Sequence, residues 1–148
     1  GYNTDVLGFE KYLAQRWQPH HKKALILGTG GVSKAVQYIL QKLGLSYRYV
    51  SRKPGVHSFS YEQLTPQVME EYTLIVNTTP LGTYPNITEA PQIPYEALTP
   101  SHYLFDMVYN PEKTLFLKKG EEKGAIIKNG YDMLEIQADE SWHIWSRV

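Results

Sequence analysis

The stretch Leu25–Ala35 constrains the fold more than any other part of the chain. It begins with aliphatic residues typical of a buried strand, continues through a glycine-rich turn and enters a segment with helical spacing. Gly28 would let the chain leave the strand in a tight turn, and the missing side chain at Gly30 would leave room for a pyrophosphate. A helix starting near Gly31 would direct free N–H groups and the positive end of its dipole at that anion. The stretch therefore predicts a strand–turn–helix unit that binds a dinucleotide.

A serine completes the glycine motif. Ser33 stands where the dinucleotide fingerprint has its third small residue, and its size permits close packing of the helix on the strand. A glycine turn by itself is equally compatible with a purely structural role, so the flanking strand and helix are what favour phosphate binding. The residues that we expect around the phosphates are Gly28, Thr29, Gly30, Gly31, Val32 and Ser33.

Composition excludes several classes of protein. The chain has 148 residues, of which 42% are hydrophobic, and this suits one domain with a real core. Fifteen basic and fifteen acidic residues cancel, so no global charge favours nucleic acid or an anionic membrane. Without cysteine there is neither a disulfide framework nor a thiolate metal site, and no apolar run approaches the roughly 20 residues that span a bilayer. We therefore expect a cytoplasmic protein without a metal, nucleic-acid or membrane partner.

Strand and helix patterns alternate from Ala24 onward. The alternation predicts an α/β fold of the Rossmann-like, doubly wound type, with about six parallel strands in the order 3-2-1-4-5-6 and helices on both faces. A helix follows the glycine turn from Val32 to Leu43, and Gly44 ends it. The other expected strands cover 25–27, 47–50, 56–59, 74–77, 103–109 and 125–128, and the other expected helices cover part of 60–72 with an interruption at Pro66, 113–123 and a closing segment from Gly130.

The first 23 residues form a helix and a polar connector in our interpretation. Helical spacing covers Val6–Trp17, and Thr4 or Asp5 would be its N-cap. His20 and His21 lie in the connector. Adjacent residues cannot both face one metal from a helix or strand, and no other ligands stand near them in the sequence. We therefore expect both histidines to be solvated loop residues.

A basic turn follows the second long strand. Ser51, Arg52 and Lys53 stand about 20 residues beyond the glycine turn, where a dinucleotide fold meets the adenosine ribose. NAD-specific sites normally place a carboxylate there, whereas this chain has a hydroxyl and two cations. The 2′-phosphate of NADP fits better, because Arg52 can make a charged, forked contact with it and also lie against the adenine. The alternative is a solvated basic turn before Pro54 and Gly55.

Two further strand ends should reach the same edge of the sheet. Small and polar residues at 77–85 follow one strand, and Tyr109–Pro111 follows the next. Ligands of doubly wound sheets bind at the carboxyl ends of the strands. Proline and glycine also serve ordinary turns, so without the fold argument the segment 77–85 would count as structural.

Taken together, these motifs resemble the carboxyl-terminal NADP-binding domain of the shikimate dehydrogenase family. The resemblance covers essentially the whole chain and rests on six motifs in the right order. Ser51 replaces the family's usual asparagine and Lys53 its usual threonine, which preserves the charge logic of the phosphate clamp. The matching segments are 1–5 (G-x-N-T-D), 28–35 (the glycine loop), 51–53 (Asn-Arg-Thr-like), 77–82 (N-x-T-x-x-G), 106–111 (D-x-x-Y-x-P) and 130–137 (G-x-x-M-L-x-x-Q).

The resemblance implies a reaction and roles for individual residues. Shikimate dehydrogenases reduce 3-dehydroshikimate to shikimate with NADPH, a step of aromatic amino acid biosynthesis. The residue matching Asp5 is catalytic: it contacts the substrate and pairs with a lysine in moving the proton. Gln137 and Tyr109 bind substrate by the same match. The match extends the cofactor-binding set to Ser51, Arg52, Lys53, Asn77, Thr78, Thr79, Met107, Val108 and Gly130.

The resemblance also implies a missing half. In full-length members an amino-terminal domain carries the catalytic lysine and the residues that hold the substrate carboxylate. We therefore expect residues 1–23 to be an interdomain helix and connector, and residues 24–148 to be the NADP-binding domain, inactive by itself and sharing a small-molecule substrate with the amino-terminal domain. We expect the start at Gly1 to be an internal or processed position, and a homodimer is a further expectation.

Two alternatives stay open at this point. One is a stand-alone NADP-binding or sensing module without chemistry, and the other is a relative that acts on quinate. Asp5 favours an enzyme over a sensor, since a sensor has no need of that carboxylate. The residues that distinguish quinate from shikimate lie largely in the missing half.

Overall fold

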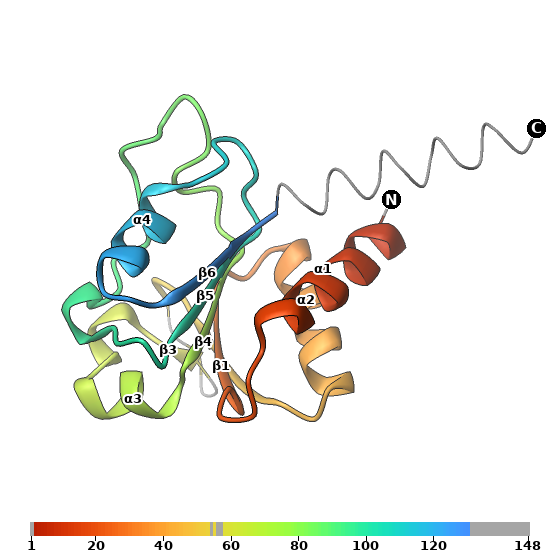
Figure 1. Cartoon of the computed structure of the whole chain (residues 1–148), viewed down its shortest axis with the longest axis horizontal. Coiled ribbons are helices and arrows are strands. Elements are labelled where there is room, and N and C mark those ends of the chain that lie inside the picture. Colours follow the sequence, from red (N-terminus) through yellow and green to blue (C-terminus); the bar gives the residue numbers. More distant parts are fainter. Residues whose placement is uncertain (1, 54, 56–57, 131–148) are drawn as a thin grey trace, which may run out of the picture.

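The computed structural model describes residues 2–53, 55 and 58–130, with side chains from residue 8 onward. Figure 1 shows one sheet with helices on both of its faces. The elements in chain order are α1 (Tyr2–Arg16), β1 (Lys23–Leu27), α2 (Gly31–Lys42), β2 (Ser46–Val50), β3 (Ser58–Phe59), η1 (Tyr61–Gln63), α3 (Pro66–Glu71), β4 (Leu74–Asn77), η2 (Tyr95–Ala97), β5 (Tyr103–Asp106), α4 (Leu115–Glu122) and β6 (Ile126–Asn129).

The sheet has six strands, all parallel, in the order β3-β2-β1-β4-β5-β6. The predicted fold class and strand order are therefore confirmed. Parallel strands need long crossovers, and the helices in these crossovers cover the sheet. The register aligns the last residues of neighbouring strands: Leu27 lies opposite both Val50 and Asn77, and Asn77 lies opposite Asp106. The carboxyl ends of four strands thus form one edge.

Two hydrophobic clusters fill the layers on either side of the sheet. Successive residues of a strand point to opposite faces, so Ala24 and Ile26 of β1 join one cluster and Leu25 and Leu27 the other. The first cluster packs α1 and α2 on the sheet, and the second packs α3 and α4 on the opposite face (Figure 1). The helically spaced apolar residues of α2, Val36, Ile39 and Leu40, are buried. Leu43, which lies just beyond the end of the helix, is 45% exposed.

Helix α1 begins earlier than its spacing predicts. It starts at Tyr2, so Thr4 and Asp5 lie in its first turn and the expectation that one of them is the N-cap is wrong. The later part of the helix packs on the sheet, where Phe9 and Leu13 are buried. The Tyr103 hydroxyl donates a hydrogen bond of 3.1 Å to the carbonyl of Leu13. Helix α1 is thereby anchored to the start of β5.

Three element boundaries differ from the sequence prediction, two of them because a threonine side chain caps a helix. Pro66 opens α3 instead of interrupting it, and the Thr65 hydroxyl accepts a hydrogen bond from the Val68 amide. Thr114 caps α4 in the same way, so this helix starts at 115 rather than 113. Strand β5 ends at Asp106, and residues 107–109 leave the sheet.

His21 is fully buried, which contradicts its expected place in solvent. Its Nδ1 accepts from the Gln18 amide at 2.9 Å, so its Nε2 carries the proton and donates to the Ser101 carbonyl at 3.0 Å. His20 is exposed as expected, and its Nε2 lies 2.9 Å from the same carbonyl. Within the described part of the chain, no group of three or more His, Asp or Glu residues could hold a metal ion.

Several sequence predictions fall on residues that the structure does not describe. These are the closing helix within 131–148, with Gln137, and the side chain of Asp5. Among the described helices, none is long and apolar enough to cross a membrane.

Candidate functional site

The predicted ligand residues meet at the carboxyl edge of the sheet. The loops there continue the hydrogen-bond ladder of the strands for one more residue. The Gly28 amide donates to Val50 at 3.1 Å, the Thr78 amide to Leu27 at 2.9 Å and the Met107 amide to Asn77 at 3.0 Å. Four loops are therefore held side by side where each strand ends. The structure brings together the glycine loop, 51–53, 77–79 and 107–108, as expected from the topology.

The glycine loop contains one glycine that packs closely, Gly28, and two that face open space, Gly30 and Gly31. Gly28 has a φ of +104°, and a Cβ there would lie 2.7 Å from the Thr78 hydroxyl oxygen. Gly30 is the N-cap of α2, makes no side-chain cap, and would carry a Cβ with nothing within 4 Å. Thr29 and Gly31 are exposed, and Val32 is 47% exposed. The start of α2 therefore faces open space, as an anion site requires.

Ser33 has the packing role that its place in the motif predicts. It is fully buried under the first turn of α2. Its hydroxyl donates to the Gly30 carbonyl at 2.5 Å. This bond fixes the loop backbone from within, so Ser33 supports the phosphate loop without facing a ligand.

The basic turn after β2 forms no ion pair within the described part of the chain. Arg52 and Lys53 are exposed, and among the described residues neither forms an ion pair. The Ser51 hydroxyl oxygen lies 3.1 Å from the Lys53 amide, which donates to it, and this bond shapes the turn. Two exposed cations that form no ion pair with a described residue are suited to a ligand phosphate.

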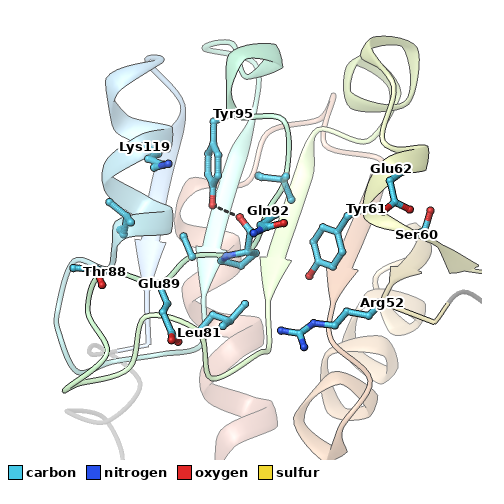
Figure 2. Close-up of a pocket in the computed structure, with 14 residues that line it drawn as sticks. Arg52, Ser60, Tyr61, Glu62, Leu81, Thr88, Glu89, Gln92, Tyr95 and Lys119 are labelled. Atoms are coloured by element: carbon cyan, nitrogen blue, oxygen red, sulfur yellow. Dashed lines mark hydrogen bonds between the residues drawn. The ribbon is translucent and has the colours of Figure 1, made fainter.

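A groove joins the glycine loop to this turn. It has a volume of about 420 Å³ and lies between Thr29, Ser51 and Thr79, with Val50 and Leu81 among the residues of its wall. Arg52, Tyr61 and Leu81 also line a larger cavity of about 820 Å³ that reaches towards α4. Figure 2 shows the Arg52 side chain below the Tyr61 ring in this view, with Tyr95 and Lys119 on the opposite side of the cavity. The groove has the size and aromatic wall that suit a nucleoside.

A buried carboxylate, whose role the sequence motifs did not reveal, holds two of these loops. Asp106 is fully buried at the end of β5. Its oxygens accept hydrogen bonds from the Asn77 amide at 3.1 Å, the Val108 amide at 2.9 Å and the Thr114 hydroxyl at 2.6 Å. Burial raises the pKa of the Asp106 carboxyl to about 6, and the hydrogen bonds oppose that rise. A charged residue that ends an otherwise apolar strand is the sequence feature that could have revealed it.

The Asn77 side chain makes its hydrogen bonds within the protein, one of them to Asp106. Asn77 is fully buried, and its oxygen accepts from the Thr79 amide at 3.0 Å and hydroxyl at 2.7 Å. Both ends of the Asn77 amide are thus used within the loop. Asn77 positions Thr79, which is half-buried and lines the 420 Å³ groove.

Comparison with known proteins identifies relatives of the chain. No family model matches it. A shikimate dehydrogenase (NADP⁺) of Desulforamulus reducens is 31% identical and aligns with 99% of this chain and 57% of its own. One of Caldicellulosiruptor bescii is 36% identical over 97% of this chain and 55% of its own. The crystal structure of Thermus thermophilus shikimate 5-dehydrogenase, in complex with NADP(H) and shikimate, matches 98% of this chain and 57% of its own at 28% identity and a TM-score of 0.77. This chain is a homologue of the shikimate dehydrogenases.

The resemblance of the motifs to shikimate dehydrogenases is thereby confirmed. The chain spans about half the length of the curated shikimate dehydrogenases that it matches, 57% and 55% for the two relatives above.

The remaining residues of the shikimate dehydrogenase motifs differ in exposure. Met107 is half-buried against the core and Val108 is buried, whereas Tyr109 is 50% exposed. Gly130 is packed so closely that a Cβ would lie 2.6 Å from the Met107 carbonyl oxygen. Gly130 therefore holds the end of β6 against the loop after β5. The side chains of Asp5 and Gln137 lie outside the described residues.

Proposed function

We propose that this chain is the NADP(H)-binding domain of a shikimate dehydrogenase, and that the longer protein interconverts 3-dehydroshikimate and shikimate. One observation carries the proposal: an open glycine loop at the start of α2 stands beside Ser51, Arg52 and Lys53, where no carboxylate pairs with the cations among the described residues. The names of the two curated relatives specify NADP⁺, and the Thermus thermophilus structure contains NADP(H) and shikimate.

The chain's residues fit the cofactor in three places. The amides at the start of α2 would bind the pyrophosphate, because the loop there is exposed and uncapped. The 420 Å³ groove would hold the adenosine, with Arg52 among the residues of its wall. Met107, Val108 and Gly130, at the far side of the edge, would border the nicotinamide. NADPH supplies the hydride for the ketone when it is bound.

The substrate would lie between this domain and an amino-terminal one. We propose that Asp5 orients a substrate hydroxyl and tunes a lysine of the other domain, and that Tyr109 and Gln137 contact the substrate. The exposed Tyr109 stands at the edge of the sheet, as that role requires. The division into 1–23 as interdomain helix and connector and 24–148 as cofactor domain is part of the proposal. A cytoplasmic location and a homodimer also remain predictions.

Calorimetric titration of the chain with NADP⁺ and NAD⁺ tests the cofactor assignment. A charged hydrogen bond contributes roughly 1.5–3 kcal/mol, so NADP⁺ should bind at least about tenfold more tightly. Arg52→Ala should narrow this difference. Equal affinities of the wild-type chain for both cofactors would contradict the proposal. Shikimate oxidation, assayed for the chain alone and after addition of the matching amino-terminal domain, tests the activity, which should appear only in the mixture.

A further inference from the structure

A second groove borders the basic turn on the side away from Tyr61. It has a volume of about 660 Å³ and lies between α2 and the strands β2 and β3. The Tyr49 hydroxyl donates to the Gln37 side-chain oxygen on its floor, and the Gln37 nitrogen donates to the Tyr47 hydroxyl at 2.6 Å. These bonds hold the helix and the strand at a fixed separation. The groove is therefore a built feature of the α2–β2 layer.

Two lysines stand on the walls of this α2–β2 groove. Lys34 comes from the first turn of α2 and Lys53 from the turn after β2. Among the described residues, no aspartate or glutamate lines the groove and neither lysine forms an ion pair. Both cations are therefore available to an anionic ligand. The wall also carries Thr29 and Ser51, which line the 420 Å³ groove as well.

The shared residues place the ribose at the junction of the two grooves. Ser51 directly follows β2, the position at which a dinucleotide fold meets the ribose hydroxyls. Arg52 lines the 420 and 820 Å³ cavities but not the α2–β2 groove, whereas Lys53 lines both the 420 Å³ groove and the α2–β2 groove. A ribose at Ser51 can thus turn its base towards Arg52 and its 2′-substituent towards the two lysines.

We propose that Lys34 is a specificity-determining residue that, together with Lys53, binds the 2′-phosphate of NADP(H) in the α2–β2 groove. This assignment rests on the proposed function and adds Lys34 to the residues of the basic turn that are expected to contact the phosphate. Arg52 lies on the adenine side and contacts the phosphate from there, whereas the two lysines bind the phosphate from the α2–β2 groove. Lys34 follows Ser33, the last residue of the glycine fingerprint, so one short segment contributes to both phosphate sites.

The test compares Lys34→Gln with the wild-type chain by calorimetric titration with NADP⁺, NAD⁺ and adenosine 2′-monophosphate. Loss of one charged contact should raise the Kd for NADP⁺ and for adenosine 2′-monophosphate about tenfold. The Kd for NAD⁺, which lacks the 2′-phosphate, should change less than about twofold. Lys34→Arg keeps the charge and should retain most of the NADP⁺ affinity.

Lys42→Gln is the matched control, because it removes the same charge from the same helix. Lys42 lies eight residues, about 12 Å, further along α2 and pairs with Glu10 at 3.1 Å. Lys42→Gln should leave the affinities for NADP⁺, NAD⁺ and adenosine 2′-monophosphate unchanged, since charges beyond about 8 Å are screened at physiological salt. Unchanged NADP⁺ affinity in Lys34→Gln would overturn the inference, and so would an equal loss for NADP⁺ and NAD⁺, which would place Lys34 at the pyrophosphate. A wild-type chain that does not prefer NADP⁺ would instead contradict the proposed function.

Discussion

The two ends of the sheet treat their buried ionisable groups in opposite ways. At the amino end, His21 and His102 are buried and neutral, and both nitrogens of each ring bond to main-chain groups. At the carboxyl end, a single buried carboxylate, Asp106, ties the loops together. The loops themselves leave Arg52 and Lys53 exposed. At the amino end, the buried groups bond to the protein's own main chain. At the carboxyl end, a buried carboxylate holds the loops, while the two cations of the loops remain exposed.

The difference teaches how a parallel sheet can hold a ligand edge in place. Buried polar groups cost free energy unless they are hydrogen-bonded, so both ends must satisfy them. The histidines do this with carbonyls and amides of 18, 69, 99 and 101, which closes the amino end with protein alone. Asp106 instead joins β4, the loop after β5 and the start of α4. The outer surface of the edge then keeps its own groups for a ligand.

Removal of the Asp106 carboxylate should produce the largest effect. Asp106→Ala leaves the Asn77 amide, the Val108 amide and the Thr114 hydroxyl without their acceptor. Unsatisfied buried groups cost about 1–3 kcal/mol each, so the free energy of unfolding should fall by about 4 kcal/mol. Asp106→Asn keeps one acceptor oxygen and should lose about 1 kcal/mol. Urea unfolding at pH 7 measures both, and equal losses would show that the hydrogen bonds do not hold the edge.

The pH dependence of stability should separate the two ends next. Burial, with the neighbouring His20, lowers the pKa of His21 to about 4, so the unfolded chain takes up that proton first as the pH falls from 6.5. The free energy of unfolding therefore decreases on acidification by about 3 kcal/mol, at about 1.4 kcal/mol per pKa unit. Burial raises the pKa of Asp106 from 3.8 to about 6, so the folded chain binds that proton first. The contribution of Asp106 to the free energy of unfolding therefore increases by about 3 kcal/mol as the pH falls from 6 to 4.

Two variants should change the slope of the free energy of unfolding against pH in opposite directions. In Asp106→Asn the histidine contribution is unopposed, and stability should fall more steeply than in the wild-type chain between pH 7 and pH 4. In His21→Gln the fall should be shallower or reversed, although burial also lowers the pKa of His102. Urea unfolding at pH 4, 5.5 and 7 gives the three profiles. Parallel profiles would contradict the opposite behaviour of the two ends.

The sequence predicted what depends on short periodic segments. Alternating strands and helices sufficed for the order of the sheet, and parallel topology then placed 28–33, 51–53 and 77–79 at one edge. The residues at which helices start were less predictable. Helix α1 starts at Tyr2, and Pro66 opens a helix where its effect was expected to be disruptive.

The burial of His21 and the role of Asp106 depend on partners far away in the chain. His21 bonds to a carbonyl 80 residues later in the chain, and the sequence of its own connector does not indicate that bond. Asp106 meets Asn77 because the strand register puts them opposite each other. The groove that contains Lys34 likewise exists only once α2 has packed on β2. Such residues are found from the assembled fold, while motif residues are found from the sequence.

The openness of the carboxyl edge can be tested within the glycine loop itself, with a smaller expected effect. Gly30→Val places its branched side chain where nothing lies within 4 Å of the Cβ, so the fold should be kept and the melting temperature little changed. The side chain would occupy the space proposed for the pyrophosphate, and NADP⁺ affinity should fall about 100-fold, roughly 2.7 kcal/mol. Gly28→Ala is the contrasting variant, because its Cβ would lie 2.7 Å from the Thr78 oxygen at a φ of +104°. It should lower the free energy of unfolding by about 2 kcal/mol. Thermal unfolding and calorimetry of both variants provide the check, and a collapse of folding in Gly30→Val would mean that this glycine serves the backbone and not the ligand.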